Sequence, residues 1–487
     1  MKRGVRVKRT PFSFVRSLND SSQSAVDRPL FFAYLALLLW LPLPLGSNRV
    51  WAWSLMEVWT LVLAVAWLIQ YLRGKVGINR SFVRAWPVTA CLLITTLWVI
   101  VQTLPLPADV LRLLSPQSLD IHSMTQSYSS LSLDVHATRQ SVLKTLCYLL
   151  MFCLTLLLVN DKPRIKLLAQ VIVLGGVFQA GYGALMTLSG LEYGFFIEKE
   201  AYRGVATGTF INRNHLAGYL EMCLAVGVGL MLAELSKRPA VDWRDRARHL
   251  LRTLLGSKAL VRLALVVMVI GLVLTHSRMG NTAFLVSLTV VGAFYLFVIR
   301  RITRGSMIFF ASLLVIDLLV VGNFFGIEEV VQRLQETTLA GDLRVELSRD
   351  TLAIVQDFPL TGTGAGSFYS TYPLYNSGEV SPAFYRHAHN DYLQFASEFG
   401  LVALILLGFS VLASLWAAVT AQIKRRDRLL QGMGFAATMG IIALLIHSAV
   451  DFNLQIPANA AMFVVLMALA WVCRYWDPQA GPMKPWK

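Results

Sequence analysis

The sequence predicts an all-α polytopic membrane protein with about 12 transmembrane helices, and two observations predict it. Of its 487 residues, 56% are hydrophobic and only 15% are charged, whereas ordinary soluble domains have near 25% charged residues. The apolar residues also gather in runs of about 20, the length that an α-helix needs to cross the hydrocarbon core of a bilayer. Together these observations exclude an ordinary soluble enzyme.

The apolar runs define the predicted spans. In chain order they are 30–45, 53–72, 86–104, 141–159, 167–188, 215–233, 262–275, 281–298, 306–325, 393–421, 430–450 and 456–473. The seventh is short and is expected to extend into its neighbours. The basic amino terminus precedes the first run without a small-residue cleavage site, which indicates an uncleaved first span.

The Lys and Arg residues predict the orientation, because cytoplasmic loops carry an excess of them. Most of the 44 lie at the amino terminus and in alternate loops, among them 237–262 and 424–428, which we expect to be cytoplasmic. This asymmetry explains the net charge of +16 better than a nucleic-acid surface does, since no basic domain stands apart. Three long segments then lie on the outer side: 105–140, 189–214 and 326–392.

The longest outer segment, 326–392, begins with charged and aliphatic residues at helical spacing, and Pro359 is expected to end that helix. A glycine-rich run, 361–368, follows. A dinucleotide fingerprint needs a strand before it and a helix after it, and neither is predicted here. We therefore interpret the run as a turn that lets the backbone approach a ligand.

A polar cluster directly precedes the apolar run 393–421. It consists of Arg386, His387, His389, Asn390 and Asp391. Polar groups are expensive next to a lipid-facing helix, and histidine changes charge near neutral pH, so the cluster is a candidate for catalysis. The alternative is a collar of snorkelling side chains at the membrane interface.

Five outer arginines form a second candidate group: Arg203, Arg213, Arg278, Arg344 and Arg386. A guanidinium offers a rigid fork of donors that matches phosphate oxygens, and it stays charged when partly desolvated. Arginines converging from different loops would suit a diphosphate. The alternative for each is an anchor at the membrane interface.

Other polar residues are expected to be structural. Asn212 and Asn214 begin a span, where capping is expected of at least one of them. His447 and Asp451 lie four residues apart on one helix face, which favours a structural hydrogen-bonded pair over direct chemistry. The five cysteines lack the spacing of metal ligands, so neither a disulfide nor a metal site is expected.

Four stretches resemble the O-antigen ligase and O-antigen polymerase superfamily of bacterial envelope glycosyltransferases. They are GVATGTFINRNHLAGYLEM (204–222), LTHSRMG (274–280), the run 344–400 that ends in RHAHNDYLQFASEFG, and HSAVDFNLQIPA (447–458). The histidine motif with its downstream glycine is the most specific of them. The first five spans contain no motif that matches.

The resemblance implies an architecture of the glycosyltransferase C type. It implies helices of residues 1–188, a catalytic region 189–473 with a periplasmic loop 326–392, and a cytoplasmic tail 474–487. The expected location is the bacterial inner membrane, with both termini cytoplasmic and the active site periplasmic. The expected partners are the bilayer, a lipid-linked glycan donor, a glycan or lipid A-core acceptor, and other polysaccharide assembly proteins, but no nucleic acid.

The implied reaction transfers a glycan from an undecaprenyl-diphosphate carrier to an acceptor hydroxyl, without a cofactor or an obligatory metal. The leading hypothesis is an inverting polymerase of surface polysaccharide or exopolysaccharide. The alternatives are a ligase that transfers the glycan to lipid A-core or to protein and, from another class, a glycan transporter. A transporter would carry charged residues in mid-span, whereas this chain concentrates them in outer loops.

The residues fit this chemistry. A diphosphate leaves without needing a proton, so the reaction needs cations at the leaving group and a base for the acceptor hydroxyl. His389 matches the family's histidine and is the expected base, with Asn390 or Asp391 orienting its ring; the additional His387 leaves the assignment between the two open. The expected substrate-binding residues are Arg203, Arg213, Arg278, Arg344, Arg386, Asn214, Asn390 and Asp391.

Overall fold

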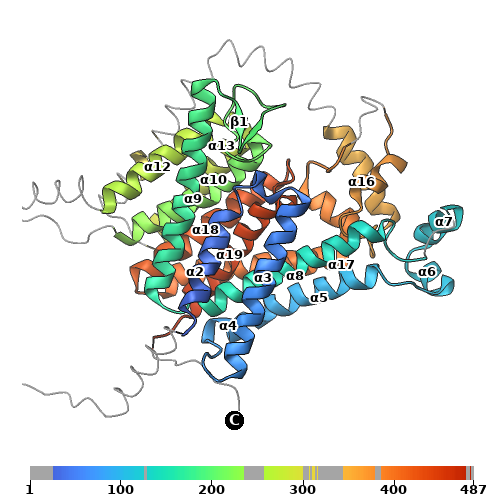
Figure 1. Cartoon of the computed structure of the whole chain (residues 1–487), viewed down its shortest axis with the longest axis horizontal. Helices are drawn as coiled ribbons and strands as arrows, with labels where there is room; N and C mark the ends of the chain where they lie inside the picture. Colours follow the sequence, from blue (N-terminus) through green and yellow to red (C-terminus); the bar gives the residue numbers. More distant parts are fainter. Residues whose placement is uncertain are drawn as a thin grey trace, which may run out of the picture.

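A computed structural model describes residues 26–125, 129–234, 257–299, 344–378 and 385–478, together with residues 307, 310–312, 315 and 483. Its described residues form a bundle of helices with one short hairpin, β1 (Tyr193–Gly194) and β2 (Ile197–Glu198) (Figure 1). The predicted all-α class is confirmed.

The bounds of the helices follow the apolar runs of the sequence. In chain order they are α2 (Arg28–Trp40), α3 (Val50–Leu72), α4 (Arg80–Arg84), α5 (Trp86–Gln102), α6 (Ala108–Leu114), α7 (Pro116–Thr125), α8 (Val135–Leu158), α9 (Lys162–Ser189), α10 (Arg213–Glu234), α12 (Ser257–Leu274), α13 (Arg278–Ala293), α16 (Phe368–Thr371), α17 (Asp391–Lys424), α18 (Arg428–Ser448) and α19 (Pro457–Tyr475). Residues 344–357 are also helical, and that helix ends just before Pro359 as predicted.

Within the described residues, eight helices are long and apolar enough to cross a membrane. Three shorter apolar helices, Arg28–Trp40, Trp86–Gln102 and Ala259–Leu274, coincide with further predicted spans. The predicted span 306–325 and the predicted cytoplasmic loop 237–262 lie largely outside the described residues. The chain is therefore a multi-pass membrane protein.

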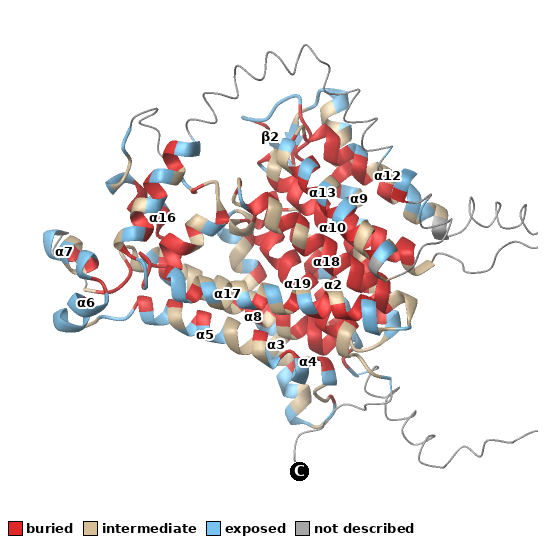
Figure 2. Ribbon diagram, turned by 180° about the vertical axis from the view of Figure 1, so that it is seen from behind, coloured by how far each residue is buried: buried red, intermediate tan, exposed pale blue. Residues whose placement is uncertain are grey.

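Helices α10, α18 and α19 form the centre of the bundle (Figure 2). In the most apolar stretch of α10, 94% of the residues are buried, whereas the corresponding value for α3 is 28%. Close contact between α10 and α18 depends on small residues, because a Cβ at Gly229 would lie 2.8 Å from the Cβ of Ala436. The surrounding helices present their apolar faces outward, as lipid-facing helices do.

Helix α17 is interrupted at Gly400, and the interruption anchors the glycine-rich run. Gly400 has φ +77°, and a Cβ there would collide with the carbonyl of Leu360. The amides of Thr363 and Gly364 donate to the carbonyls of Ser397 and Glu398, at 2.8 and 3.0 Å. The run is therefore a turn as predicted, and the backbone it approaches is that of α17.

Helix α5 also contacts the junction between the glycine-rich run and α17. The side-chain amide of Gln102, at the end of α5, donates to the carbonyls of Thr361 and Glu398, at 2.7 and 3.0 Å. The indole of Trp98 donates to the carbonyl of Phe399 at 2.9 Å. The histidine motif thus begins a helix whose first turns are fixed by α5 and by the glycine-rich run.

Candidate functional site

Three histidines surround the ring of Phe452, in the turn between α18 and α19. His387 stacks on it with centroids 4.4 Å apart, and His389 and His215 meet it edge-on at 4.7 and 4.6 Å. His215 comes from the first turn of α10, and the other two come from the loop before α17. Segments distant in the sequence therefore meet at one aromatic ring.

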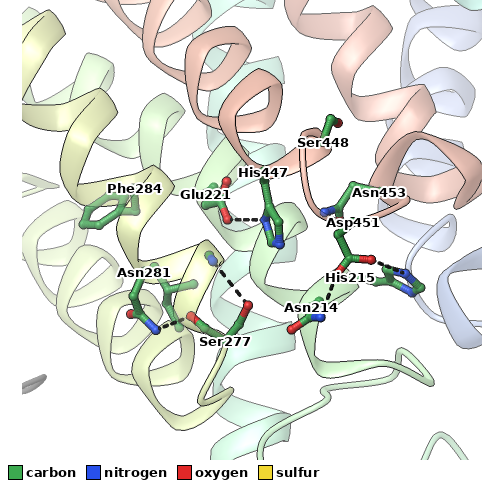
Figure 3. Close-up of polar contacts among 12 residues, drawn as sticks. Asn214, His215, Glu221, Ser277, Asn281, Phe284, His447, Ser448, Asp451 and Asn453 are labelled. Atoms are coloured by element: carbon green, nitrogen blue, oxygen red, sulfur yellow. Dashed lines mark hydrogen bonds and ion pairs between the residues drawn. The ribbon is translucent and has the colours of Figure 1, made fainter. Parts of the chain in front are cut away.

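Asp451, next to Phe452, is the carboxylate of this cluster (Figure 3). Its Oδ2 accepts a hydrogen bond from Asn214 Nδ2 at 2.5 Å, and its Oδ1 accepts from the amide of Phe452 at 2.8 Å. The same Oδ1 lies 3.9 Å from His215 Nε2 and 4.0 Å from His389 Nδ1. Neither of these ring nitrogens forms a hydrogen bond within the described residues. Asp451 is therefore placed between two imidazoles.

The two polar residues that follow His389 in the sequence have other partners. Asn390 caps α17 by accepting from the amide of Leu393 at 3.1 Å. The buried Asp391 accepts from the hydroxyl of Ser448 at 2.8 Å and from the amide of Leu454 at 3.0 Å. The expectation that one of them orients the His389 ring is wrong, because these contacts fix the loop to its neighbours. The carboxylate that faces the ring is Asp451.

The electrostatic environment favours neutral histidines beside an ionised carboxylate. Burial lowers the pKa of His389, and the charge of Arg344 lowers it further, against the opposing charge of Asp451. Burial and the neighbouring histidines lower the pKa of His387 to about 3. Burial alone would raise the pKa of Asp451, but His215 and the other nearby histidines reverse this, so its pKa is lowered.

His389 is the accessible member of the pair. Its side chain is 31% exposed, whereas that of Asp451 is 2% exposed. Its backbone has φ +50°, a left-handed conformation that is uncommon for residues other than glycine and that concentrates at functional sites. A neutral, reachable imidazole beside a buried carboxylate is an arrangement suited to accept a proton.

Two of the predicted arginines lie near this cluster. The guanidinium of Arg213 lies 5.8 Å from the ring centroid of Tyr202. Burial raises the pKa of Tyr202, the charge of Asp451 raises it further, and Arg213 and Arg344 oppose the rise. The charge of Arg344 acts on His389 as well as on Tyr202.

The other predicted arginines are placed differently. Arg203 forms an exposed ion pair with Glu198 at 2.7 Å. Arg386 lies over the ring of Tyr369, 5.7 Å from its centroid, and its charge helps to lower the pKa of His387. Arg278 is exposed in the first turn of α13. The structure thus brings Arg213, Arg344, Asn214 and the two histidines together, and it does not show Arg203 or Arg386 in contact with Asp451.

The buried pair of His447 and Glu221, next to the cluster, was not predicted from the sequence. His447 Nδ1 lies 2.8 Å from Glu221 Oε1, and both side chains are 0% exposed (Figure 3). The prediction that His447 pairs with Asp451 is therefore wrong. A carboxylate inside the apolar run 215–233 was the signal that could have revealed Glu221, because such a group is expensive in a span. His215 was missed as well, although it lies in one of the matching stretches.

Gly280 allows the arginine-bearing turn to pack against α10 near this pair. A Cβ at Gly280 would lie 2.5 Å from the Cβ of Ala217 and 3.2 Å from Glu221 Oε1. Ser277 caps α13 by accepting from the amide of Gly280 at 3.2 Å, and Asn281 Nδ2 donates to the carbonyl of Ser277 at 2.8 Å. The pair therefore lies where α10, α13 and α18 meet.

Comparison with known proteins identifies one segment. The family model described as O-Antigen ligase matches residues 263–408, a stretch that includes Arg278, Arg344, the glycine-rich run and His389. No curated protein matches the chain. The match supports a membrane enzyme that processes glycans, with lipid-linked glycan substrates, and it confirms the resemblance predicted from the motifs. Residues 263–408 are therefore similar to the O-antigen ligase family, which supports the resemblance of the chain to the O-antigen ligase and polymerase superfamily.

Proposed function

We propose that this protein is an inverting glycosyltransferase that polymerises oligosaccharide repeat units carried on undecaprenyl diphosphate. One observation carries the proposal: His389 is accessible, and its Nδ1 lies 4.0 Å from the buried carboxylate of Asp451. Burial lowers the pKa of this histidine, which favours its neutral form. A general base must be neutral before it accepts a proton, and a carboxylate behind the ring stabilises the imidazolium that forms. The family match supports the same class of reaction.

In the proposed reaction, a hydroxyl of the acceptor glycan attacks the anomeric carbon of the donor glycan from the face opposite its diphosphate. The new glycosidic C–O bond forms as the bond between the anomeric carbon and the diphosphate oxygen breaks. The hydroxyl proton passes to His389, and the electron pair of the broken bond leaves on the lipid diphosphate. Atoms and charge balance without a cofactor, and the configuration at the anomeric carbon inverts.

Arg213 and Arg344 are the proposed cations for the leaving diphosphate. Arg213 lies 5.8 Å from the ring centroid of Tyr202, and the charge of Arg344 acts on both Tyr202 and His389. Guanidinium groups match the oxygens of a diphosphate and stabilise the charge that develops on it as the bond breaks. Arg278 remains part of the proposed site through its place in the matched segment.

The proposed location is the bacterial inner membrane, with both termini cytoplasmic and the His389 site periplasmic. The distribution of Lys and Arg between loops supports this orientation. Cysteine labelling of intact cells tests it. Tyr369→Cys should react with an impermeant reagent and Arg425→Cys should not; the opposite pattern would contradict the orientation.

The activity is tested with purified protein in nanodiscs and a defined repeat unit linked to undecaprenyl diphosphate. Elongated glycan on the lipid is the expected product, and it should disappear in His389→Ala. His249→Ala is the matched control, because residue 249 lies in the segment predicted to be cytoplasmic, outside the described residues. Folded protein that transfers glycan to no acceptor would contradict the proposal.

The description of the matching family favours a ligase as the second candidate. The same assay separates the two. A polymerase lengthens the lipid-linked glycan when no other acceptor is added. A ligase leaves its length unchanged and transfers it only when lipid A-core is supplied.

A further inference from the structure

A cavity of about 800 Å³ lies among α3, α5, α8, α17 and α19. His387 forms part of its wall, whereas His389, His215 and Asp451 do not. His387 therefore contacts Phe452 of the Asp451 cluster and also lines the cavity. The cations proposed for the leaving diphosphate, Arg213 and Arg344, do not line it.

A lysine from an amino-terminal span faces this cavity. Lys144 lies in α8, and its ammonium is 3.9 Å from the ring centroid of Trp53 in α3. It forms no ion pair with a residue that the structure describes. A cation inside a membrane span is expensive, and such residues characteristically serve a ligand or a pathway.

Glu398, a buried carboxylate of the cavity wall, already has hydrogen-bond partners. Glu398 accepts hydrogen bonds from the amides of Gly366 and Phe368, at 2.9 and 3.2 Å, and from the side chain of Gln394 at 3.1 Å. Its oxygens therefore serve the junction between the glycine-rich run and α17. The charges of Glu57 and Glu398 both act on Lys144, but neither carboxylate forms an ion pair with it, so its ammonium can contact a group that enters the cavity.

The cavity has a polar end and an apolar end. Arg386 and Tyr369 join Lys144 and His387 at the polar end, and aliphatic side chains of α17 such as Leu407 and Leu412 line the other. Leu412 is 63% exposed on the outside of the bundle, where lipid would lie. An occupant that matches both ends has an anionic head and an apolar chain that reaches the bilayer.

We propose that this cavity binds a second lipid-linked substrate, an isoprenoid chain that carries phosphate or diphosphate. Lys144 and Arg386 contact the phosphates, and the chain runs between α5, α17 and α19. The inference rests on the proposed function, because a polymerase joins two such lipids. The histidines would then lie between two anion sites, with the donor diphosphate beside Arg213 and Arg344 and the acceptor lipid beside Lys144.

The chain offers two matched pairs of variants for the test. Lys144→Ala removes the charge, and Lys166→Ala is its control, since Lys166 pairs with Glu234 on α9 and α10, away from the cavity. Gly408→Leu fills the apolar end without touching a charge. Gly181→Leu on α9 is its control, because an added Cβ meets no atom within 4 Å at either glycine and only Gly408 of the two lines the cavity.

Native mass spectrometry of the purified full-length chain, titrated with undecaprenyl phosphate, counts bound lipids without turnover. Wild type and both controls should bind two molecules. Lys144→Ala and Gly408→Leu should each weaken one of the two by about tenfold or more, the change expected on losing a charge-assisted contact or the space for the chain. Undecaprenol, which lacks the phosphate, should bind equally to wild type and Lys144→Ala.

Unchanged binding of both lipids in Lys144→Ala and in Gly408→Leu would overturn the inference, even if glycan transfer is observed. Displacement of the Lys144-dependent lipid by equimolar inorganic diphosphate would also overturn it, since that would make the site one for a free anion. If lipid binding depends on Lys144 but no glycan is transferred, the proposed function fails and the lipid site stands.

Discussion

The Asp451 cluster and the cavity lined by Lys144 differ in how their polar groups are satisfied. Around Asp451, polar side chains pack against one another: Asp451 bonds to Asn214, and His447 bonds to Glu221. In the cavity wall, Lys144 faces open space between helices and forms no ion pair with a described residue. A closed polar cluster holds a geometry and a protonation state, whereas a cation in the wall of an open cavity can contact a ligand.

The largest expected effect distinguishes His389, which faces Asp451, from His387, which lines the cavity. His389→Ala removes the proposed base and should lower the rate of glycan transfer by about 10²–10⁴-fold, the usual contribution of general base catalysis. His387→Ala should leave measurable turnover. The rates are compared in the reconstituted assay at equal amounts of folded protein. If His387→Ala is the inactive variant and His389→Ala is active, the roles are exchanged.

Loss of one partner of the buried Glu221–His447 pair should lower the free energy of unfolding more than loss of both partners. Glu221→Leu leaves His447 without its partner in a fully buried place and should lower the unfolding free energy by roughly 3–5 kcal/mol. The double variant Glu221→Leu/His447→Leu should cost less than either single variant, because no polar group is then left unpaired. Unfolding in detergent by a double-mutant cycle measures this. Additive losses would show that the pair does not act as a unit.

The pH dependence should report the neighbours of His389. Transfer needs the neutral ring, so the rate should fall as pH drops through its lowered pKa, below the ordinary histidine value of about 6.5. Arg344 helps to lower that pKa, so Arg344→Met should raise it and move the acidic limb to higher pH. Profiles of kcat/KM against pH measure the shift. If the acidic limb of the profile is unchanged in Arg344→Met, Arg344 does not influence the pKa of His389.

The smallest expected effect concerns an arginine that lies away from the cluster. Arg203 pairs with Glu198 at the surface, and exposed ion pairs contribute only about 0–1 kcal/mol. Arg203→Lys should therefore change transfer less than Arg344→Lys, which loses the fork of donors beside the base. Initial rates at saturating donor compare them. An equal loss in both variants would bring Arg203 back into the proposed diphosphate site.

The sequence was sufficient for the helices because each needs only a run of apolar residues, which is a local property. The predicted runs 215–233 and 430–450, for example, are α10 and α18 with ends that differ by a few residues. The resemblance to a family was also predictable, since His389 and Arg344 lie in motifs that are similar to those of a known family. The match to residues 263–408 confirms that resemblance.

The partners within the site were less predictable, because packing decides them. Adjacency in the chain suggested Asp391 beside His389, and spacing on one helix suggested Asp451 beside His447. The chain instead turns after α18, which carries Asp451 toward His389 and leaves His447 beside Glu221, 226 residues away. The cavity was likewise not predictable from the sequence, since its walls come from helices of both halves of the chain.

The junction at Gln102 has a consequence for the synthesis of the protein. Its carbonyl partner Thr361 follows 259 residues later, and a ribosome that adds about 5–20 residues per second needs roughly 10–50 s to reach it. During that interval the amide must bond to water or to an insertion factor, because a buried polar group without a partner costs about 1–3 kcal/mol. Helix α5 therefore reaches its final surroundings only late in translation, and a chain that stops before residue 361 leaves this amide without its native partners.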